Sequence, residues 1–438
     1  MTKEEQGRGL SEGFSIKLSD YLQPLIMQLE SLMDKRLVRT FKMLIETIIT
    51  FRHSTNGLLL SELGGHLLSG DRAPAGTKRI SNLLRSPKWS FKLIEHFLWV
   101  QGCCRLEELE RENEKALLIW DESVWEKPES IAIEGLCAVR SSQASRLKRI
   151  KKGFYNPPGR PIFVPGMNWL GVVLVGMKGQ ASLLSLKWWS SRGLLKSTRR
   201  TEERSLLNKL ICTWTDRVLH IFDRGYAGSP WLKELASAKA RFVMRWSKAY
   251  KLISADGESQ KAWMIARGKR SLEHKMIHDA RRNCKRKIGL YYCQVHHPEY
   301  PEPLWLVISR QGQGKHPWYL LTNEVIQSHE DAWQIIFAYS RRWQIEAAWR
   351  FTKSELAFES PRLWKLENRL KLLFIATLAF AFLLLLLQLT SELVKQQLLR
   401  LFCHRTGKKC RIAAAPLYRF RLALSQLWLE FPPPRNAF

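Results

Sequence analysis

Residues 218–223 have the sequence VLHIFD, and an earlier stretch, residues 116–121, has the related sequence ALLIWD. Each is a short apolar run that ends at an aspartate, and such a run is typical of a strand buried on both faces of a sheet. Ligands and catalytic groups gather at the strand ends of α/β sheets, so we expect Asp121 and Asp223 to share a site. An aspartate also ends many strands for purely structural reasons, so neither residue is decisive alone.

Strand and helix patterns surround these two runs and predict an α/β domain. Strands are expected at 169–177, 182–189 and 241–245, a hairpin turn at 178–180, and helices at 201–214 and 230–239. A later group of short strand patterns follows at 262–266, 288–295, 304–309 and 318–321. Because glycine and proline turns separate these patterns, they indicate a β-rich insertion within the α/β domain.

The first hundred residues have helical periodicity, with regular apolar positions at 37–51 and 91–100. Between them, residues 72–79 (RAPAGTKR) predict a basic turn. A small helical domain with such a turn suits DNA docking, although it lacks a clear helix-turn-helix pattern. A helical domain that serves only packing is the alternative.

The charge of the chain predicts a polyanionic partner. Seventy Lys and Arg against forty Asp and Glu leave a net charge of +30, with basic clusters at 146–152, 269–270 and 281–287. Each cluster alone could be a solvated face, but together they favour nucleic acid over an anionic membrane surface. The eight cysteines form no CxxC pair, and Cys403, His404 and Cys410 lack a zinc spacing, so we expect free thiols in a reducing cytoplasm.

Residues 372–387 are sixteen consecutive residues without a charge or an amide. A membrane-spanning helix needs about 18–20 such residues, and Lys371 and Gln388 close this run on either side. We therefore predict a buried core helix. The N-terminus, residues 1–13, is polar and has no apolar core of the kind that a signal peptide carries.

A long helix is predicted from Ser328, which forms a capping-box pattern with Asp331, to about residue 356. At about 100° per residue, four of its polar residues fall on one stripe: Tyr339, Arg342, Glu346 and Lys353. A carboxylate that holds a metal, beside cations and a phenol that hold phosphates, would suit a phosphodiester. A solvated face with ion pairs is the alternative.

The spacing Tyr-x2-Arg-x3-Glu-x6-Lys resembles the signature of the DDE transposases of insertion-sequence family four. Residues 222–226 (FDRGY) are similar to the second-aspartate block of that family, and the resemblance covers residues 116–389. It implies an α/β, RNase H-like catalytic core with an all-β insertion. Relatives often follow the first aspartate with Asp and Thr, whereas here Glu122 and Ser123 follow Asp121, so Glu122 competes for that role.

The resemblance implies a metal-dependent enzyme that cleaves and rejoins DNA by cut-and-paste transposition, through a hairpin intermediate. Asp121, Asp223 and Glu346 would be catalytic and would hold two Mg²⁺ ions about 3.5–4 Å apart, with Mn²⁺ as a possible substitute. Six further residues are predicted to bind DNA: Tyr339, Arg342, Lys353, Arg245, Trp343 and Trp246. The two tryptophans are the candidates for stacking on an extruded base, with core packing as the alternative for Trp343.

The expected partners are double-stranded DNA, both the terminal inverted repeats of a transposon and the target, and a second copy of the chain in a synaptic homodimer. We expect no membrane, and a bacterial cytoplasmic protein associated with the nucleoid. The predicted domains are a helical DNA-binding domain at 1–110, catalytic-core segments at 111–250 and 326–392, a β-strand insertion at 251–325, and a basic tail at 393–438. Three alternatives are an RNase H-like endonuclease without strand transfer, an inactive transposase-derived DNA-binding protein, and a membrane protein anchored through 372–387.

Overall fold

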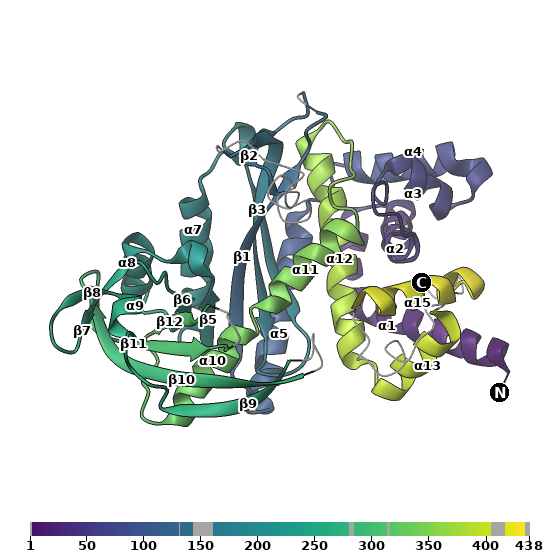
Figure 1. Ribbon diagram of the computed structural model, residues 1–438. Helices are drawn as coiled ribbons and strands as arrows, with labels where there is room; N and C mark the ends of the chain where they lie inside the picture. The colour runs from purple at the N-terminus through teal and green to yellow at the C-terminus, as the bar shows by residue number, and fades with distance from the viewer. Residues whose placement is uncertain are drawn as a thin grey trace, which may run out of the picture.

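A computed structural model describes residues 2–130, 132–142, 161–279, 284–312, 316–403 and 417–433. This part of the chain is a mixed α/β structure around one 12-stranded sheet, in the order β2-β3-β1-β5-β6-β12-β11-β10-β7-β8, with β4 on β3 and β9 on β10 (Figure 1). The basic cluster at 146–152, Arg281, Arg282, His404 and Cys410 lie outside the described residues. The described cysteines are free thiols, as expected.

The strands are β1 Ala116–Glu126, β2 Cys137–Arg140, β3 Phe163–Val175, β4 Ser182–Trp189, β5 Val218–Phe222, β6 Phe242–Arg245, β7 Lys251–Ser254, β8 Ser259–Lys261, β9 Glu273–Asp279, β10 Cys284–His297, β11 Tyr300–Arg310 and β12 Trp318–Thr322. All the predicted strands are present except that at 262–266. There the chain forms a short helix, α9 Ala262–Ile265, whose two buried residues are three positions apart, as on one face of a helix. Strands β2, β7, β8 and β9 were not predicted.

Helices cover both faces of the sheet. On one face lie α5 Lys92–Arg111, α7 Arg199–Trp214 and α8 Ser229–Ser237; on the other lie α10 His329–Ser340, α11 Trp343–Ser354 and α12 Leu366–Leu389. Since successive strand residues point to opposite faces, Trp120 packs in the first layer and Ile119 in the second. Burial on both faces explains why β1 begins with a continuous apolar run.

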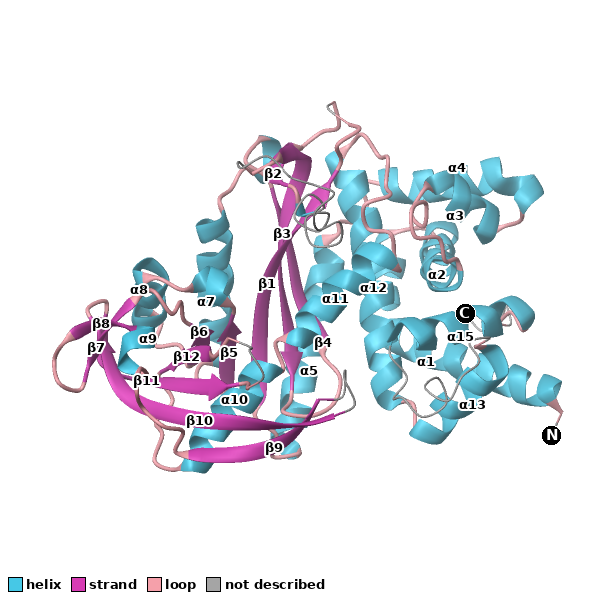
Figure 2. Cartoon of the chain, in the orientation of Figure 1, coloured by secondary structure: helices cyan, strands magenta, loops and turns pink. Residues whose placement is uncertain are grey.

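Helices from both ends of the chain pack together on α12 (Figure 2). They are α1 Lys3–Leu32, α2 Lys35–Thr50, α3 Leu60–Leu67, α4 Ala73–Arg85, α13 Glu392–Phe402 and α15 Leu417–Glu430. The buried Arg421 of α15 links this helix to α2 and to the end of α11, because its guanidinium donates to the carbonyls of Ile48, Ile49 and Glu355. The turn predicted at 72–79 is wrong: Pro74 stands in the first turn of α4, where its missing N–H costs nothing.

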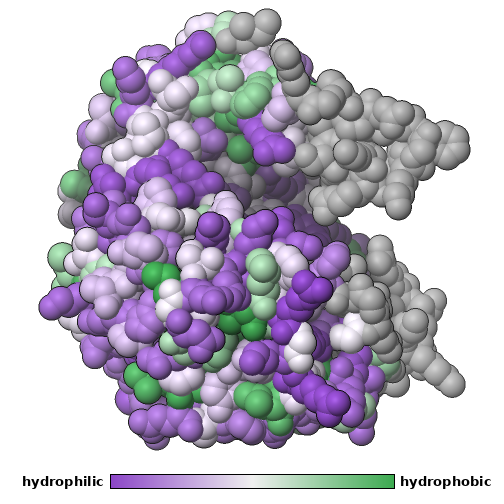
Figure 3. Space-filling model, turned by 60° about the vertical axis from the view of Figure 1, so that its left-hand side comes forward, coloured by the Kyte–Doolittle hydropathy of each residue, from purple (hydrophilic) through white to green (hydrophobic). Residues whose placement is uncertain are grey.

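Helix α12 is apolar around its whole circumference. It is the one described helix that is long and apolar enough to cross a membrane, and 83% of its most apolar window is buried inside the protein. Its charged residues have partners, since the Lys371 ammonium donates to the Ser86 carbonyl at 2.8 Å. The prediction of a buried core helix is therefore confirmed. By contrast, the face of the molecule in Figure 3 is mostly hydrophilic, with scattered apolar residues.

Candidate active site

The two predicted aspartates lie side by side in the sheet. Strands β1 and β5 are parallel, with Ile119 opposite Ile221, and Asp121 and Asp223 each follow two residues later. Strand β5 ends at Phe222, as predicted, but β1 does not end at Trp120. Its antiparallel partner β3 continues to pair with it as far as Glu126, so Asp121 lies within a strand, just past its last pairing with β5.

Asp223 is held by the turn that follows β5. It is the N-cap of the 3₁₀ turn η3 Arg224–Tyr226, and its Oδ1 accepts a hydrogen bond from the Gly225 amide at 2.7 Å. An aspartate suits this position because its short side chain can accept a hydrogen bond from the backbone of the turn that it opens. The second oxygen stays available for a ligand.

The predicted single helix from Ser328 to residue 356 is two helices. The capping box at Ser328 is present, but α10 ends at Ser340 and α11 begins at Trp343. At the break, the Arg341 guanidinium donates to the carbonyls of Gly176 and Gly179 in the β3–β4 turn. The predicted stripe is therefore divided: Tyr339 belongs to α10, whereas Glu346 and Lys353 belong to α11.

A glycine allows α11 to lie directly on β1 and β3. Gly171 is opposite Asp121 in the register of β1 with β3, and a Cβ atom there would lie 2.2 Å from Cζ2 of Trp349. The indole of Trp349 thus occupies the space that a side chain at 171 would need. Helix α11 lies beside β1 (Figure 1). Glu346 lies one helical turn before Trp349, so this close approach brings Glu346 toward Asp121, whose pKa responds to the charge of Glu346.

Asp223, Glu346 and Arg342 each act electrostatically on Asp121. The pKa of Asp121 is raised to about 7, chiefly by burial and then by the charge of Asp223, with a smaller contribution from Glu346, while the charge of Arg342 opposes the rise. Arg342 also binds Glu346 directly, with Nη2 2.5 Å from Oε1. Negative charge concentrated in a largely buried site is unfavourable unless a cation neutralises it, and Arg342 is the cation that the chain itself supplies.

Glu122 faces the other side of the sheet, toward α7. Its Oε1 lies 2.7 Å from Nε of Arg199, and the same Nε lies 2.8 Å from Glu203. Burial raises the pKa of Glu122 to about 8; the charge of Arg199 lowers it and that of Glu203 raises it. Because Glu122 points away from Glu346 and is engaged by Arg199, the geometry favours Asp121 as the partner of Asp223.

The predicted phosphate-binding residues differ in exposure. Burial raises the pKa of the Tyr339 phenol, which is 2% exposed, whereas nearby Arg342 and Arg245 lower it. Lys353 donates from Nζ to the Val124 carbonyl at 2.6 Å. Arg245 and Arg342 therefore lie around Tyr339 near the carboxylates, while the Lys353 ammonium is held against β1.

The two predicted stacking tryptophans have opposite environments. Trp343, at the start of α11, is 53% exposed, and the Arg342 guanidinium lies 5.3 Å from its ring centroid. Trp246 is 2% exposed and packs edge-on against Tyr250 and His297. The structure thus disfavours core packing for Trp343 and does not support stacking by Trp246, whose ring is covered.

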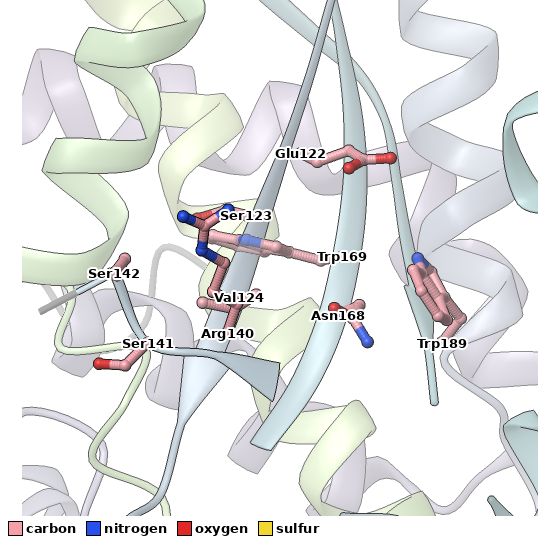
Figure 4. Close-up of a pocket in the computed structure, with 9 residues that line it drawn as sticks. All are labelled: Glu122, Ser123, Val124, Arg140, Ser141, Ser142, Asn168, Trp169 and Trp189. Carbon is pink, nitrogen blue, oxygen red and sulfur yellow. The ribbon is translucent and has the colours of Figure 1, made fainter. Parts of the chain in front are cut away.

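A pocket of about 370 Å³ adjoins β1 just beyond Asp121 (Figure 4). It is lined by Glu122, Ser123, Val124, Arg140, Ser141, Ser142, Asn168, Trp169 and Trp189. The sequence alone does not indicate that Arg140 and Asn168 line this pocket or that Arg199 pairs with Glu122 beside it. No local pattern marks them, because they come from β2, β3 and α7 and meet β1 only in the folded sheet.

As the side chains stand, the described residues contain no group of three His, Cys, Asp or Glu side chains that could hold a metal ion. Glu346 is bound by Arg342 instead of joining the two aspartates. Chemically the set still fits a hard divalent cation, because its members are carboxylates and because burial, with the charges of Asp223 and Glu346, raises the pKa of Asp121. Asp121 and Asp223 are thus two candidate ligands, and Glu346 would be a third after release from Arg342.

Residues 193–381 match the family model described as the transposase DDE domain. The match includes Asp223 and Glu346, whereas Asp121 precedes it. Among solved structures, the chain is similar to a cryo-EM structure of the piggyBac transposase synaptic complex with hairpin DNA, with 13% identity over 92% of this chain and 74% of that chain and a TM-score of 0.40. A likeness of that size transfers no structural detail to this chain. No curated protein matches the sequence.

Proposed function

We propose that this chain is a DDE transposase of the insertion-sequence family four type, which cleaves DNA and joins the released end to a target. The observation that carries the proposal is that Asp121 and Asp223 follow adjacent parallel strands at one edge of the sheet, where the charge of Glu346, which is paired with Arg342, also acts on Asp121. The match of residues 193–381 to the transposase DDE domain supports it independently. The net charge of +30 supplies the attraction for DNA.

An RNase H-like core is part of this proposal. The strand order β4-β3-β1-β5-β6 supports it, because β4, β3 and β1 are antiparallel neighbours and β1, β5 and β6 are parallel neighbours. The site lies at the C-terminal end of β5, where α/β sheets gather their catalytic groups. Helix α11, which packs on the face of the sheet that α10 and α12 also cover, supplies the third carboxylate, Glu346.

Divalent metal, with two Mg²⁺ ions as the expected form, would be held by Asp121, Asp223 and Glu346. When bound, it would activate the attacking oxygen and stabilise the leaving 3′-oxygen of an in-line displacement. The chain contributes the positions of the carboxylates: Gly225 orients Asp223, and Trp349 sets the depth of α11. Arg342 holds Glu346 in the free protein, and its guanidinium would be free to bind a DNA phosphate if Glu346 served as a metal ligand.

Cut-and-paste transposition through a hairpin is the finer proposal, and the exposure of Trp343 supports it. A hairpin at a DNA end requires a base to leave the stack, and an exposed indole next to a guanidinium can receive that base. The substrates would be terminal inverted repeats and target DNA, bound by a homodimer. We further propose a cytoplasmic, nucleoid-associated protein.

The test pairs the neutral variants Asp223→Asn and Glu346→Gln with exposed controls in the β7–β8 turn, Asp256→Asn and Glu258→Gln. We expect the two site variants to lose cleavage of a transposon-end duplex by about 10³-fold or more, as when a member of a concerted catalytic set is removed. They should keep DNA binding, and the controls should keep both. Cleavage by either site variant at the wild-type rate would contradict the proposal.

Two further measurements separate the alternatives. Binding of Mn²⁺, followed by titration calorimetry or electron spin resonance, should weaken in Glu346→Gln and in Asp223→Asn, which tests metal binding without activity. A pre-cleaved end mixed with a target plasmid should give joined product. Nicks without joining would favour an endonuclease, and DNA binding without either reaction would favour an inactive DNA-binding protein.

A further inference from the structure

A basic pocket lies at strands β9, β10 and β11, which are several strands away from β1 in the sheet order. Its volume is about 420 Å³, and it is lined by Ser271, His274, Arg286, Lys287, Gly289, Arg310, Gln311 and Gly312. Three of these eight residues are cationic and none is acidic. Like charges that share a cavity repel each other, so such a pocket favours an anion with several oxygens.

The sheet register places this pocket at the same edge as the aspartates. Arg245, at the C-terminal end of β6, pairs with Leu320 near the start of the antiparallel strand β12. Trp318, the first residue of β12, pairs with Ser309 of β11, and Arg310 is the next and last residue of β11. Arg310 in turn is opposite Gly289 of β10. Four strand steps separate β5 from β10, which at about 4.8 Å per step is roughly 19 Å across the sheet.

The walls of the pocket are fixed by hydrogen bonds. The Arg310 guanidinium donates to Ser271 Oγ at 3.1 Å and to the Lys269 carbonyl at 2.7 Å. Arg286 is 8% exposed and donates to the Gln311 carbonyl at 2.8 Å. These two guanidiniums are therefore held in place before any ligand arrives, whereas the exposed Lys287 side chain can adjust to one.

Gly289 keeps the floor of the pocket open. A Cβ atom at this position would lie 2.4 Å from Ser271 Oγ and 3.3 Å from His274 Nε2, so a side chain would fill the space between β9 and β11. The neighbouring Ser271 hydroxyl and the Gln311 amide are polar groups that suit phosphate oxygens.

We infer that this pocket binds a backbone phosphate of DNA at a second contact, several base pairs from the phosphate that is cleaved. The identity of the anion rests on the proposed function, whereas the pocket itself does not. At about 3.4 Å of rise per base pair, roughly 19 Å corresponds to five or six base pairs. Lys287 makes the direct contact, and Arg286 and Arg310 supply the surrounding positive potential.

The test compares Lys287→Gln with Lys261→Gln, an equal charge change at an exposed lysine on β8 at the end of the sheet order. Affinity for a short duplex is measured between about 50 and 200 mM salt. Losing one phosphate contact should lower the slope of log K against log salt by about 0.9, which corresponds to about five-fold weaker binding at 0.15 M. Lys261→Gln should change neither quantity.

Acetylation of lysines, read by mass spectrometry on the wild-type chain with and without duplex, gives a second measurement. DNA should protect Lys287 and leave Lys261 reactive. Equal reactivity of Lys287 with and without DNA, or an unchanged salt slope in Lys287→Gln, would overturn the inference even in a chain that cleaves DNA. Conversely, a protected Lys287 in a chain without cleavage activity would leave the pocket standing and overturn the proposed function.

Discussion

Substituting Gly171 by alanine should test how α11 positions Glu346. The new Cβ would lie 2.2 Å from Cζ2 of Trp349, whereas carbon atoms in contact prefer about 3.5–4.0 Å. Helix α11 must therefore move away from the sheet by more than 1 Å, or Trp349 must leave its rotamer. Overpacking of this kind costs about 1–3 kcal/mol, of which replacing a strand glycine offsets about 0.5–1 kcal/mol.

We expect Gly171→Ala to unfold at lower urea and to lose cleavage of a transposon-end duplex by about 10²-fold, because a displacement of about 1 Å can cost that much in a positioned site. Shortening the indole in Gly171→Ala with Trp349→Leu should restore part of both losses. Gly9→Ala in α1, where an added Cβ meets nothing within 4 Å, is the control and should lose neither. Wild-type stability and cleavage in Gly171→Ala would refute the reasoning.

Three further outcomes are expected. Trp343→Ala should nick a transposon end normally and form few hairpins on a denaturing gel; an equal loss in both steps would point to a structural role. Burial raises the pKa of Glu46 to about 7 from its ordinary value of 4.5, so its carboxylate costs stability as the pH rises through that interval. Glu46→Gln should therefore gain up to about 3 kcal/mol over wild type at pH 8 and nothing at pH 4, measured by urea unfolding; equal curves at pH 8 would contradict this. DNA affinity should fall by several powers of ten between 50 and 200 mM salt in a binding assay, and a flat dependence would exclude counterion release.

The sequence predicted those elements whose pattern is local. The apolar runs of β1 and β5 predicted two buried strands that lead to Asp121 and Asp223, and the capping box at Ser328 predicted the start of α10. The burial of α12 followed from the length of its apolar run and from the charges that close it. In each case the deciding residues are consecutive or a few positions apart.

The features that the sequence did not predict depend on contacts between distant segments. No proline or glycine marks the break between α10 and α11, where Arg341 instead reaches the β3–β4 turn. Strand β1 continues through the polar Glu122 and Ser123 because β3 pairs with it. Likewise, the ion pair of Glu122 with Arg199 joins residues 77 positions apart, so only the folded chain shows which carboxylate faces the site.

The position of α12 in the chain matters during synthesis. A nascent segment of this composition resembles a membrane span, and it is synthesised before α13 and α15. Helices α1, α2 and α4 precede it, however, and all three contact α12 in the finished protein. Since domains fold from the N-terminus as they are made, the early helices provide a surface that can cover these leucines at once. Deleting α1 and α2 should therefore divert the nascent chain toward aggregation or a membrane even if the catalytic residues are all intact.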